Sequence, residues 1–200
     1  MTGFLWESGE DGATPLSPEG AADLTPQYRH ITLRRELDVV EAANIARAAV
    51  WAYDSQRALP TLLEPRFVCA LHKHMFGDVW TWAGIYRKHD VHIGNSRYYE
   101  IPMALRQLTD DATYWFAQGT YSDDEAAVRF HHRLVLIHPF PNGNGRLSRF
   151  MGNLLAVARG HDIFGWSDSL GDQARSLYMD ALHAADRHEL EALLDFARTP

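Results

Sequence analysis

The sequence predicts a nearly all-α fold that carries one small β-hairpin. Hydrophobic residues make up 46% of the 200 positions and charged residues 22%, which are the proportions of a soluble domain with a buried core. From about residue 30 onward, most segments repeat apolar residues three or four positions apart, which is the period of an amphipathic helix. Residues 86–101 instead alternate around Gly94-Asn95, as the strands of a hairpin do.

Glycines and prolines divide the N-terminal part of the chain into short pieces, so we expect residues 1–29 to form an irregular leader. Within it, a short helix can begin at Ser17-Pro18, with the serine as its cap and the proline in its first turn. Residues 30–200 are then expected to form a single domain.

Three helices are expected in the first half of this domain. Thr32 caps the first, and the second spans about 65–76 and stops at Gly77. The third runs from Pro102 to Gly119, because proline favours the first turn of a helix and glycine the residue after its end.

The start and stop signals are clearer in the second half. Ser122 and Glu125 form a capping box in front of the fourth helix, which Pro139 ends. The fifth helix follows the glycine-rich turn 143–145 and stops at Gly160. Two further helices are expected over about 173–185 and 188–198.

The charge balance and the cysteine content exclude several classes of protein. The chain has 19 Lys and Arg against 26 Asp and Glu, a net charge of −7, which is a poor match for a general binder of nucleic acid or anionic membranes. No apolar run approaches the roughly 20 residues of a membrane span, and the acidic N-terminus lacks a signal-peptide pattern, so a cytoplasmic location is expected. The single cysteine, Cys69, excludes an internal disulfide, and we expect a buried, inert thiol.

The segment 138–149 carries the chemistry. It combines a histidine at the end of a helix, a tight turn and a glycine-rich entry into the next helix. Gly143 and Gly145 let backbone N–H groups converge at a helix N-terminus, which favours an anion. Arg146 and Arg149 lie about one helical turn apart, so both can reach a polyphosphate.

Two further side chains complete this predicted site. Asn142 can offer an amide oxygen to a divalent cation, and a neutral His138 can take a proton from an attacking hydroxyl. Together these groups imply transfer of a phosphate-containing group from a nucleotide to a hydroxyl. The phosphate-binding pattern GxxxxGK[ST] is absent, and Ser148 replaces the third glycine of a dinucleotide-binding fingerprint.

The segment resembles the signature of the Fic family, HPFx[D/E]GNGRxxR. Eight of the nine specified positions match, and Asn142 is the departure. The resemblance covers roughly residues 30–198, and residues 12–16 of the leader are similar to the branch called mobile mystery protein B. The matching positions are His138, Pro139, Phe140, Gly143, Asn144, Gly145, Arg146 and Arg149.

The resemblance implies a role for each matching residue. His138 would deprotonate the target hydroxyl, and Phe140 would anchor the loop in the core. The Gly-Asn-Gly turn at 143–145 would form an anion hole, and Arg146 would bind the phosphates of the nucleotide. Arg149 would hold the γ-phosphate or pair with an inhibitory glutamate.

The resemblance also implies an activity. Most members transfer AMP from ATP, with Mg²⁺ or Mn²⁺, to a Ser, Thr or Tyr hydroxyl of a target protein. The intact Gly-Asn-Gly turn, which the phosphorylating Doc branch replaces, favours AMP transfer. A flap before the third helix would align the target by strand pairing. The residues of this flap are Gly94, Asn95, Ser96, Arg97, Tyr98, Tyr99 and Glu100.

The departure at Asn142 leaves alternatives open. Asparagine keeps a ligand oxygen but lacks the charge of the family's Asp or Glu, so the affinity for a metal is expected to fall. The alternatives to AMP transfer are removal of AMP from a modified protein, another nucleotide or phosphoryl transfer on the same scaffold, and a nucleotide-binding regulator without catalysis.

Many members carry an inhibitory helix with the pattern [S/T]xxxE[G/N], whose glutamate pairs with the second arginine. Residues 32–36 fit its first five positions, which makes Glu36 a candidate. Glu19, which a glycine follows, is a second candidate. No such pattern follows the signature, so a separate antitoxin-like partner is a further alternative.

The other histidines and the tryptophans are expected to serve packing or to lie on the surface. The histidine pairs at 72/74, 89/92 and 131/132 lack an HExxH pattern, which argues against a metal hydrolase. The tryptophans are scattered, which is typical of core packing rather than of a platform for nucleic-acid bases.

Overall fold

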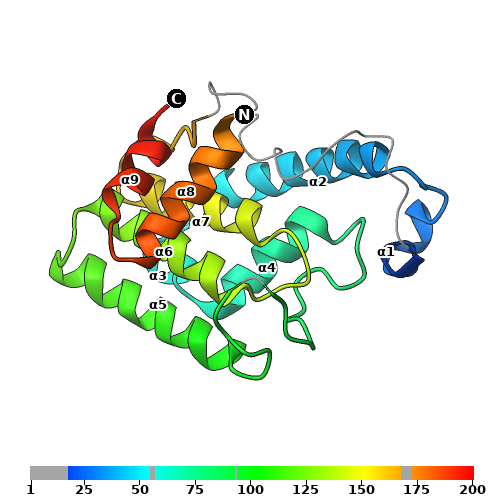
Figure 1. Ribbon diagram of the computed structural model, residues 1–200, viewed down its shortest axis with the longest axis horizontal. Helices are drawn as coiled ribbons and strands as arrows, with labels where there is room; N and C mark the ends of the chain where they lie inside the picture. The colour runs from blue at the N-terminus through cyan, green and yellow to red at the C-terminus, as the bar shows by residue number, and fades with distance from the viewer. Residues whose placement is uncertain (1–17, 55–56, 93, 168–172) are drawn as a thin grey trace.

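The computed structural model describes residues 18–54, 57–92, 94–167 and 173–200 (Figure 1). Within these ranges the chain is built from helices joined by loops and turns. The elements are α1 (Pro18–Ala22), the 3-10 helix η1 (Pro26–Tyr28), α2 (Arg34–Asp54), α3 (Leu59–Leu62), α4 (Pro65–Phe76), α5 (Ile101–Gln118), α6 (Asp123–Ile137), α7 (Asn144–Ala158), α8 (Ala174–Asp186) and α9 (Glu191–Arg198).

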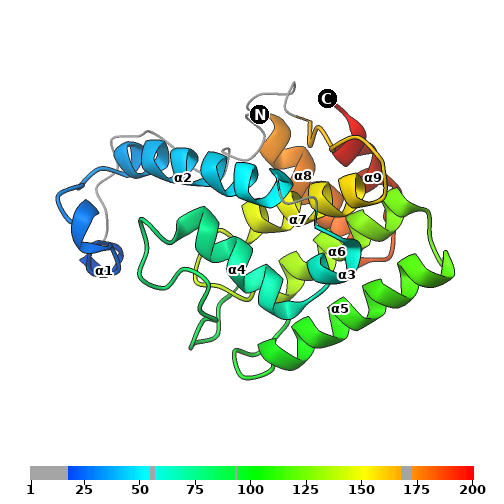
Figure 2. The same cartoon turned by 180° about the vertical axis from the view of Figure 1, so that it is seen from behind.

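Helices α6 and α7 form the centre of the molecule, and they make the most extensive helix pair (Figure 1). Helix α5 packs along one side of α6, while α8 and α9 pack on each other and α9 contacts α6. On the other side, α2 and α4 lie side by side, and α1 sits at the far end of α2, away from α8 and α9 (Figure 2). The turn that joins α6 to α7 is partly exposed, because Pro141 is exposed whereas Pro139, Phe140 and Gly143 are buried.

The core is densest where α6 and α7 face each other. Phe130 and Leu134 of α6, with Leu147, Phe150 and Met151 of α7, are at most 1% exposed. Their spacing of three or four residues places them on one face of each helix. Because burial of one large apolar side chain contributes about 1.5–3 kcal/mol, this interface fixes how the two helices meet.

The helix boundaries follow the capping signals. The hydroxyl of Ser122 accepts a hydrogen bond from the backbone N–H of Glu125 at 3.2 Å, and α6 begins at the next residue. Gly119 ends α5 in the left-handed region, with φ of 60°. Three features differ from expectation. Helix α2 begins at Arg34 rather than directly after Thr32, α9 begins at Glu191 rather than at about 188, and the short α3 was not predicted.

The second part of the predicted leader packs onto the domain. The short helix expected at Ser17-Pro18 is confirmed as α1. After it, Leu24 is fully buried, and Thr25 donates its backbone N–H to the carbonyl of Val79 at 2.9 Å. The segment 12–16 lies outside the described residues.

The β-hairpin predicted over 86–101 is wrong for the described part of that segment, which contains turns and bends but no strand. In a hairpin the backbone carbonyls of this segment would accept hydrogen bonds from the opposite strand. Here two of them accept hydrogen bonds from a side chain instead. The guanidinium of Arg87 donates to the carbonyls of His89 and Ser96, at 2.8 and 2.6 Å. The flap is therefore a loop that one buried side chain ties together.

Two smaller expectations can be checked on the described residues. No helix among them combines the length and the apolar character needed to cross a membrane. Cys69 is half-buried rather than buried, and burial raises the pKa of its thiol, so the unreactive protonated form prevails at neutral pH.

Candidate active site

His138 caps the C-terminal end of α6 in a left-handed conformation, with φ of 50° and ψ of 60°. The carbonyl of His138 accepts a hydrogen bond from Arg87 Nε at 2.7 Å, which holds the strained backbone. On its ring, Nδ1 lies 3.3 Å from the carbonyl oxygen of Val135. A proton on Nδ1 can donate to that oxygen, and the lone pair then lies on Nε2, which is the form a general base requires.

The turn after His138 is closed by a reciprocal pair of hydrogen bonds. The side chain of Asn144 accepts from the backbone N–H of Phe140 at 2.9 Å and donates to the carbonyl of Phe140 at 2.8 Å. The Phe140 ring is fully buried. The amide of Asn144 therefore shapes the turn from inside the protein, and only its backbone N–H is available to an anion at the helix start.

His72 of α4 holds this turn from the other side, and sequence reasoning assigned it only to packing. Its Nδ1 accepts from the backbone N–H of Gly84 at 2.9 Å, so the proton lies on Nε2, which donates to the carbonyl of Asn142 at 3.0 Å. The ring also stacks on Phe140, with ring centres 3.8 Å apart. Burial lowers the pKa of His72 to about 3, so the ring is neutral at physiological pH.

Gly143 starts α7 under two constraints that only glycine meets. Its φ is 77°, and a Cβ atom at this position would lie 2.6 Å from the ring of Phe76. The first N–H groups of this 15-residue helix have no carbonyl one turn earlier within the helix. Together with the helix dipole they form a positive end that can hold phosphate oxygens.

Arg146, in the first turn of α7, is paired with a buried glutamate from α2. Its Nη1 donates to Oε2 of Glu41 at 2.5 Å, and the two residues are 4% and 0% exposed. Oε1 of Glu41 accepts from the indole N–H of Trp80 at 2.6 Å. The sequence held a signal for this residue, because Glu41 lies four positions from both Leu37 and Ile45 on the buried stripe of α2.

The flap reaches the site at Gly94. A Cβ atom on Gly94 would lie 2.5 Å from the carbonyl oxygen of Leu136 and 3.1 Å from Cβ of His138. The next backbone N–H, that of Asn95, donates to the same carbonyl at 2.9 Å. Farther along the flap, Tyr99 is 66% exposed. The structure thus brings the start of the flap against His138 and leaves its aromatic part at the surface.

Residues 62–156 match the model of the Fic/DOC family. The chain carries a Fic/DOC family domain. The matched residues include α4, α5, α6, the turn at 143–145 and nearly all of α7, whereas Glu41 lies outside them.

Curated relatives of this Fic/DOC domain carry adenylyltransferase names. The probable protein adenylyltransferase Fic of Salmonella typhimurium is 25% identical over 142 residues, which cover 66% of this chain and 70% of that protein. The protein adenylyltransferase fic-1 of Caenorhabditis briggsae is 28% identical over 132 residues, which cover 64% of this chain and 25% of that protein. The present chain therefore matches only about a quarter of the nematode protein.

Solved Fic domains share the fold. The N-terminal Fic domain of a Bartonella quintana effector with bound ADP superposes with a TM-score of 0.66 at 19% identity, covering 98% of this chain and 92% of that one. Fic-1 of Caenorhabditis elegans superposes with a TM-score of 0.65 at 23% identity, covering 79% of this chain and 47% of that one. At this level of identity the likeness shows a common fold.

Arg149, the second arginine of the Fic/DOC signature, belongs to α7 and is fully buried. Its guanidinium carbon lies 5.4 Å from the centre of the Tyr178 ring in α8. Burial, and next the positive charge of Arg149, hold the pKa of the His131 imidazole well below its usual value. The structure therefore places Arg149 inside the fold and Arg146 closer to the anion-binding turn.

Of the two glutamates predicted to pair with Arg149, only Glu36 has a described side chain, and no contact joins it to Arg149. Glu36 is exposed in the first turn of α2. Glu19 belongs to α1, but its side chain is outside the described part of the structure. Glu41 instead contacts a signature arginine, and that arginine is Arg146.

Asn142 offers a poor metal site. Its side-chain oxygen already accepts from the backbone N–H of Gly143 at 2.6 Å. Among the described residues, no group of three or more His, Cys, Asp or Glu side chains is placed to hold a metal ion. Mg²⁺ in nucleotide sites is usually held by one or two carboxylates together with phosphates. The side chains of this turn therefore do not fit a resident divalent cation, and a metal here would depend mainly on the phosphates of the nucleotide.

Proposed function

We propose that the Fic/DOC domain of this chain transfers AMP from ATP to a Ser, Thr or Tyr hydroxyl of a target protein. The observation that carries the proposal is that one short turn joins His138, which ends α6, to the anion-binding start of α7. A base and a phosphate cradle are thus adjacent, as nucleotidyl transfer requires. The adenylyltransferase names of the relatives support the same reaction.

The proposed step uses Nε2 of His138 as the base. Nε2 takes the proton of the target hydroxyl while the hydroxyl oxygen forms a bond to the α-phosphorus of ATP. The bond from the α-phosphorus to the oxygen that bridges the β-phosphate breaks, and pyrophosphate leaves. The N–H groups at the start of α7 stabilise negative charge on the phosphates during this transfer.

We propose that Glu41 regulates this step by competing for Arg146. The phosphates and the carboxylate are both anions that require the same guanidinium, so nucleotide binding must break or share the ion pair. An antitoxin-like partner that held α2 against α7 would favour the paired state and suppress transfer.

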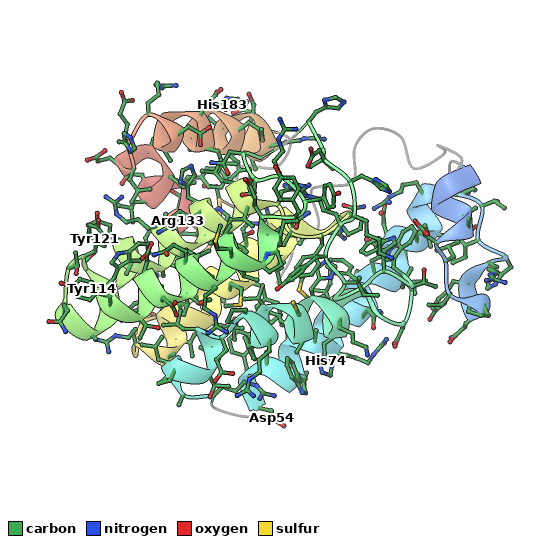
Figure 3. All side chains as sticks on the ribbon, turned by 90° about the horizontal axis from the view of Figure 1, so that it is seen from below. Asp54, His74, Tyr114, Tyr121, Arg133 and His183 are labelled. Carbon is green, nitrogen blue, oxygen red and sulfur yellow. The ribbon has the colours of Figure 1, made fainter. Side chains whose placement is uncertain are left out.

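The test is incubation of the protein and a host lysate with ATP that carries the label on either the α- or the γ-phosphate. Transfer of only the α-label to protein supports the proposal, and transfer of only the γ-label indicates a phosphotransferase. Release of AMP from a labelled protein indicates the reverse reaction. The same assay is run on His138→Ala, which lacks the proposed base. Its matched control is His183→Ala, because His183 is exposed on α8 (Figure 3). Absence of transfer by the wild type contradicts the proposal.

A further inference from the structure

A cavity lies beside the flap, against α6. It has a volume of about 670 Å³ and is bounded by α5, α6, the end of α8 and the flap residues Gly94 and Asn95. Arg133 and Tyr121 both line it, and their labelled side chains lie at the same end of the molecule in Figure 3. Neither residue belongs to the Fic/DOC signature, and the reaction proposed above does not use the cavity.

The cavity lies beside the catalytic site and shares neighbours with it. Leu136, two residues before His138, lines its wall, and the same helix face supplies Arg133. Gly94 also lines the cavity and lies against His138, since a Cβ atom added there would come within 3.1 Å of the histidine Cβ. A polypeptide segment whose hydroxyl faced His138 would therefore pass the mouth of this cavity.

Basic side chains outnumber acidic ones in the lining of the cavity. Arg129, Arg133 and two histidines line it, against one acidic residue, Asp186. Asp186 lies 2.8 Å from a lining histidine, His132. The two arginines also have carboxylate partners outside the lining, since Arg129 pairs with Glu125 and Arg133 with Asp111. A preference of the cavity for a negatively charged group therefore depends on whether one of these guanidiniums keeps nitrogens for a second carboxylate.

Arg133 is oriented by its neighbours and keeps nitrogens for a second carboxylate. Its Nη1 donates to Asp111 at 2.6 Å, and its guanidinium carbon lies 5.5 Å from the ring centre of Trp115. Among the described residues, none accepts a hydrogen bond from Nε or Nη2 of Arg133. These two nitrogens form the edge of a guanidinium that binds both oxygens of one carboxylate.

We propose that this cavity recognises an acidic side chain of the target protein, with Arg133 as its partner. The proposal rests on the AMP transfer proposed above, because the acceptor hydroxyl must face His138. In an extended segment, residues two positions apart point to the same side and lie about 6.5–7 Å apart. The acidic residue is therefore expected two positions from the acceptor, on the side that runs along α6 toward Arg133.

The experiment uses fluorescent peptides with a central Ser, Thr or Tyr and with Glu, Gln or Lys placed at each flanking position in turn. AMP transfer from α-labelled ATP gives kcat/KM for each peptide, and fluorescence anisotropy gives its affinity without turnover. The variants are Arg133→Gln and Arg133→Glu. The matched control is Arg159→Gln, because Arg159 is also half-exposed, pairs with an aspartate and lies outside the cavity.

The wild type is expected to favour Glu over Gln about tenfold at one flanking position, through KM rather than kcat. Arg133→Gln should lose this preference, Arg133→Glu should favour Lys, and Arg159→Gln should keep the wild-type pattern. Equal rates and affinities for Glu and Gln peptides in the wild type would overturn the proposal. If no peptide accepts AMP, the proposed reaction fails for these acceptors. The affinities then test the proposed role of the cavity separately. Binding of Glu peptides that depends on Arg133 supports this role, and the absence of such binding refutes it.

Discussion

The ion pair between Glu41 and Arg146 can be tested by a double-mutant cycle. Glu41→Gln removes the negative charge but keeps an oxygen that can accept from Trp80. Arg146→Met removes the positive charge and keeps a chain of similar length. Each single variant removes one charge of the buried pair, whereas the double variant removes both. In Arg146→Met, Glu41 keeps only the longer contact with Arg34, whose Nη2 lies 3.6 Å from Oε2.

The magnitude follows from burial, because the two side chains are 5% and 0% exposed. Removal of one partner of a buried pair typically costs about 3–5 kcal/mol of unfolding free energy. We expect each single variant to lose about this much, and the double variant to lose at least about 2 kcal/mol less than the sum of the two. Glu36→Gln, an exposed change on the same helix, should stay within about 0.5 kcal/mol of the wild type.

The assay is urea unfolding followed by circular dichroism, together with calorimetric titration of ADP. If the two single losses add to within about 0.5 kcal/mol, the pair contributes no coupling and the reasoning fails. For ADP, a folded Glu41→Gln variant should bind more tightly than the wild type, because the phosphates no longer compete with a carboxylate. Unchanged or weaker ADP binding would show that Glu41 only positions Arg146.

The remaining predictions concern four single residues. His138→Ala should reduce AMP transfer by about 10²–10⁴-fold in a folded protein, and near-normal transfer would exclude it as the base. Asn142→Asp should tighten Mg²⁺ binding in the presence of ADP, and an equal affinity in metal titrations would show that residue 142 is not a ligand. Arg87→Lys should raise KM for a target protein and leave ADP affinity unchanged, because lysine cannot hold three carbonyls at once. Because the folded-state pKa of His72 is about 3, below its usual value of 6.5, its unfolded form takes up a proton first as the pH falls. The contribution of His72 to the free energy of unfolding should therefore be present above pH 6.5 and be lost between pH 6.5 and about 3. A His72→Phe variant should show a flatter dependence of this free energy on pH in urea unfolding.

The features that the sequence predicts well depend on neighbouring residues. Ser122 caps α6 three residues from its partner, Gly119 ends α5 by its own backbone, and residues 138–143 form one turn between two helices. In each case the residue type and its conformation are linked over less than two helical turns. The local sequence pattern therefore predicts both the helix boundaries and the turn that carries the candidate site.

The features that the sequence does not predict are long-range polar contacts. Glu41 meets Arg146 across 105 residues, and His72 meets Asn142 across 70. Hydrophobic periodicity identifies the buried faces on which these side chains lie, but it cannot say which polar group they face. The hairpin fails for a local reason, because the side chain of Arg87 donates to backbone carbonyls that an alternating pattern assigns to a strand partner.

The junction of α6 and α7 explains why so short a motif can support charge transfer. The reaction proposed above forms a positive imidazolium at His138 and requires stabilisation of negative charge on the phosphates. A helix C-terminus stabilises a cation and a helix N-terminus stabilises an anion, each by about 0.3–1 kcal/mol at an exposed site and more when partly buried. His138 sits at the first kind of end and Gly143 at the second. Both charges therefore develop where the backbone already favours them, and the buried contacts of His72 and Arg87 keep the two ends together.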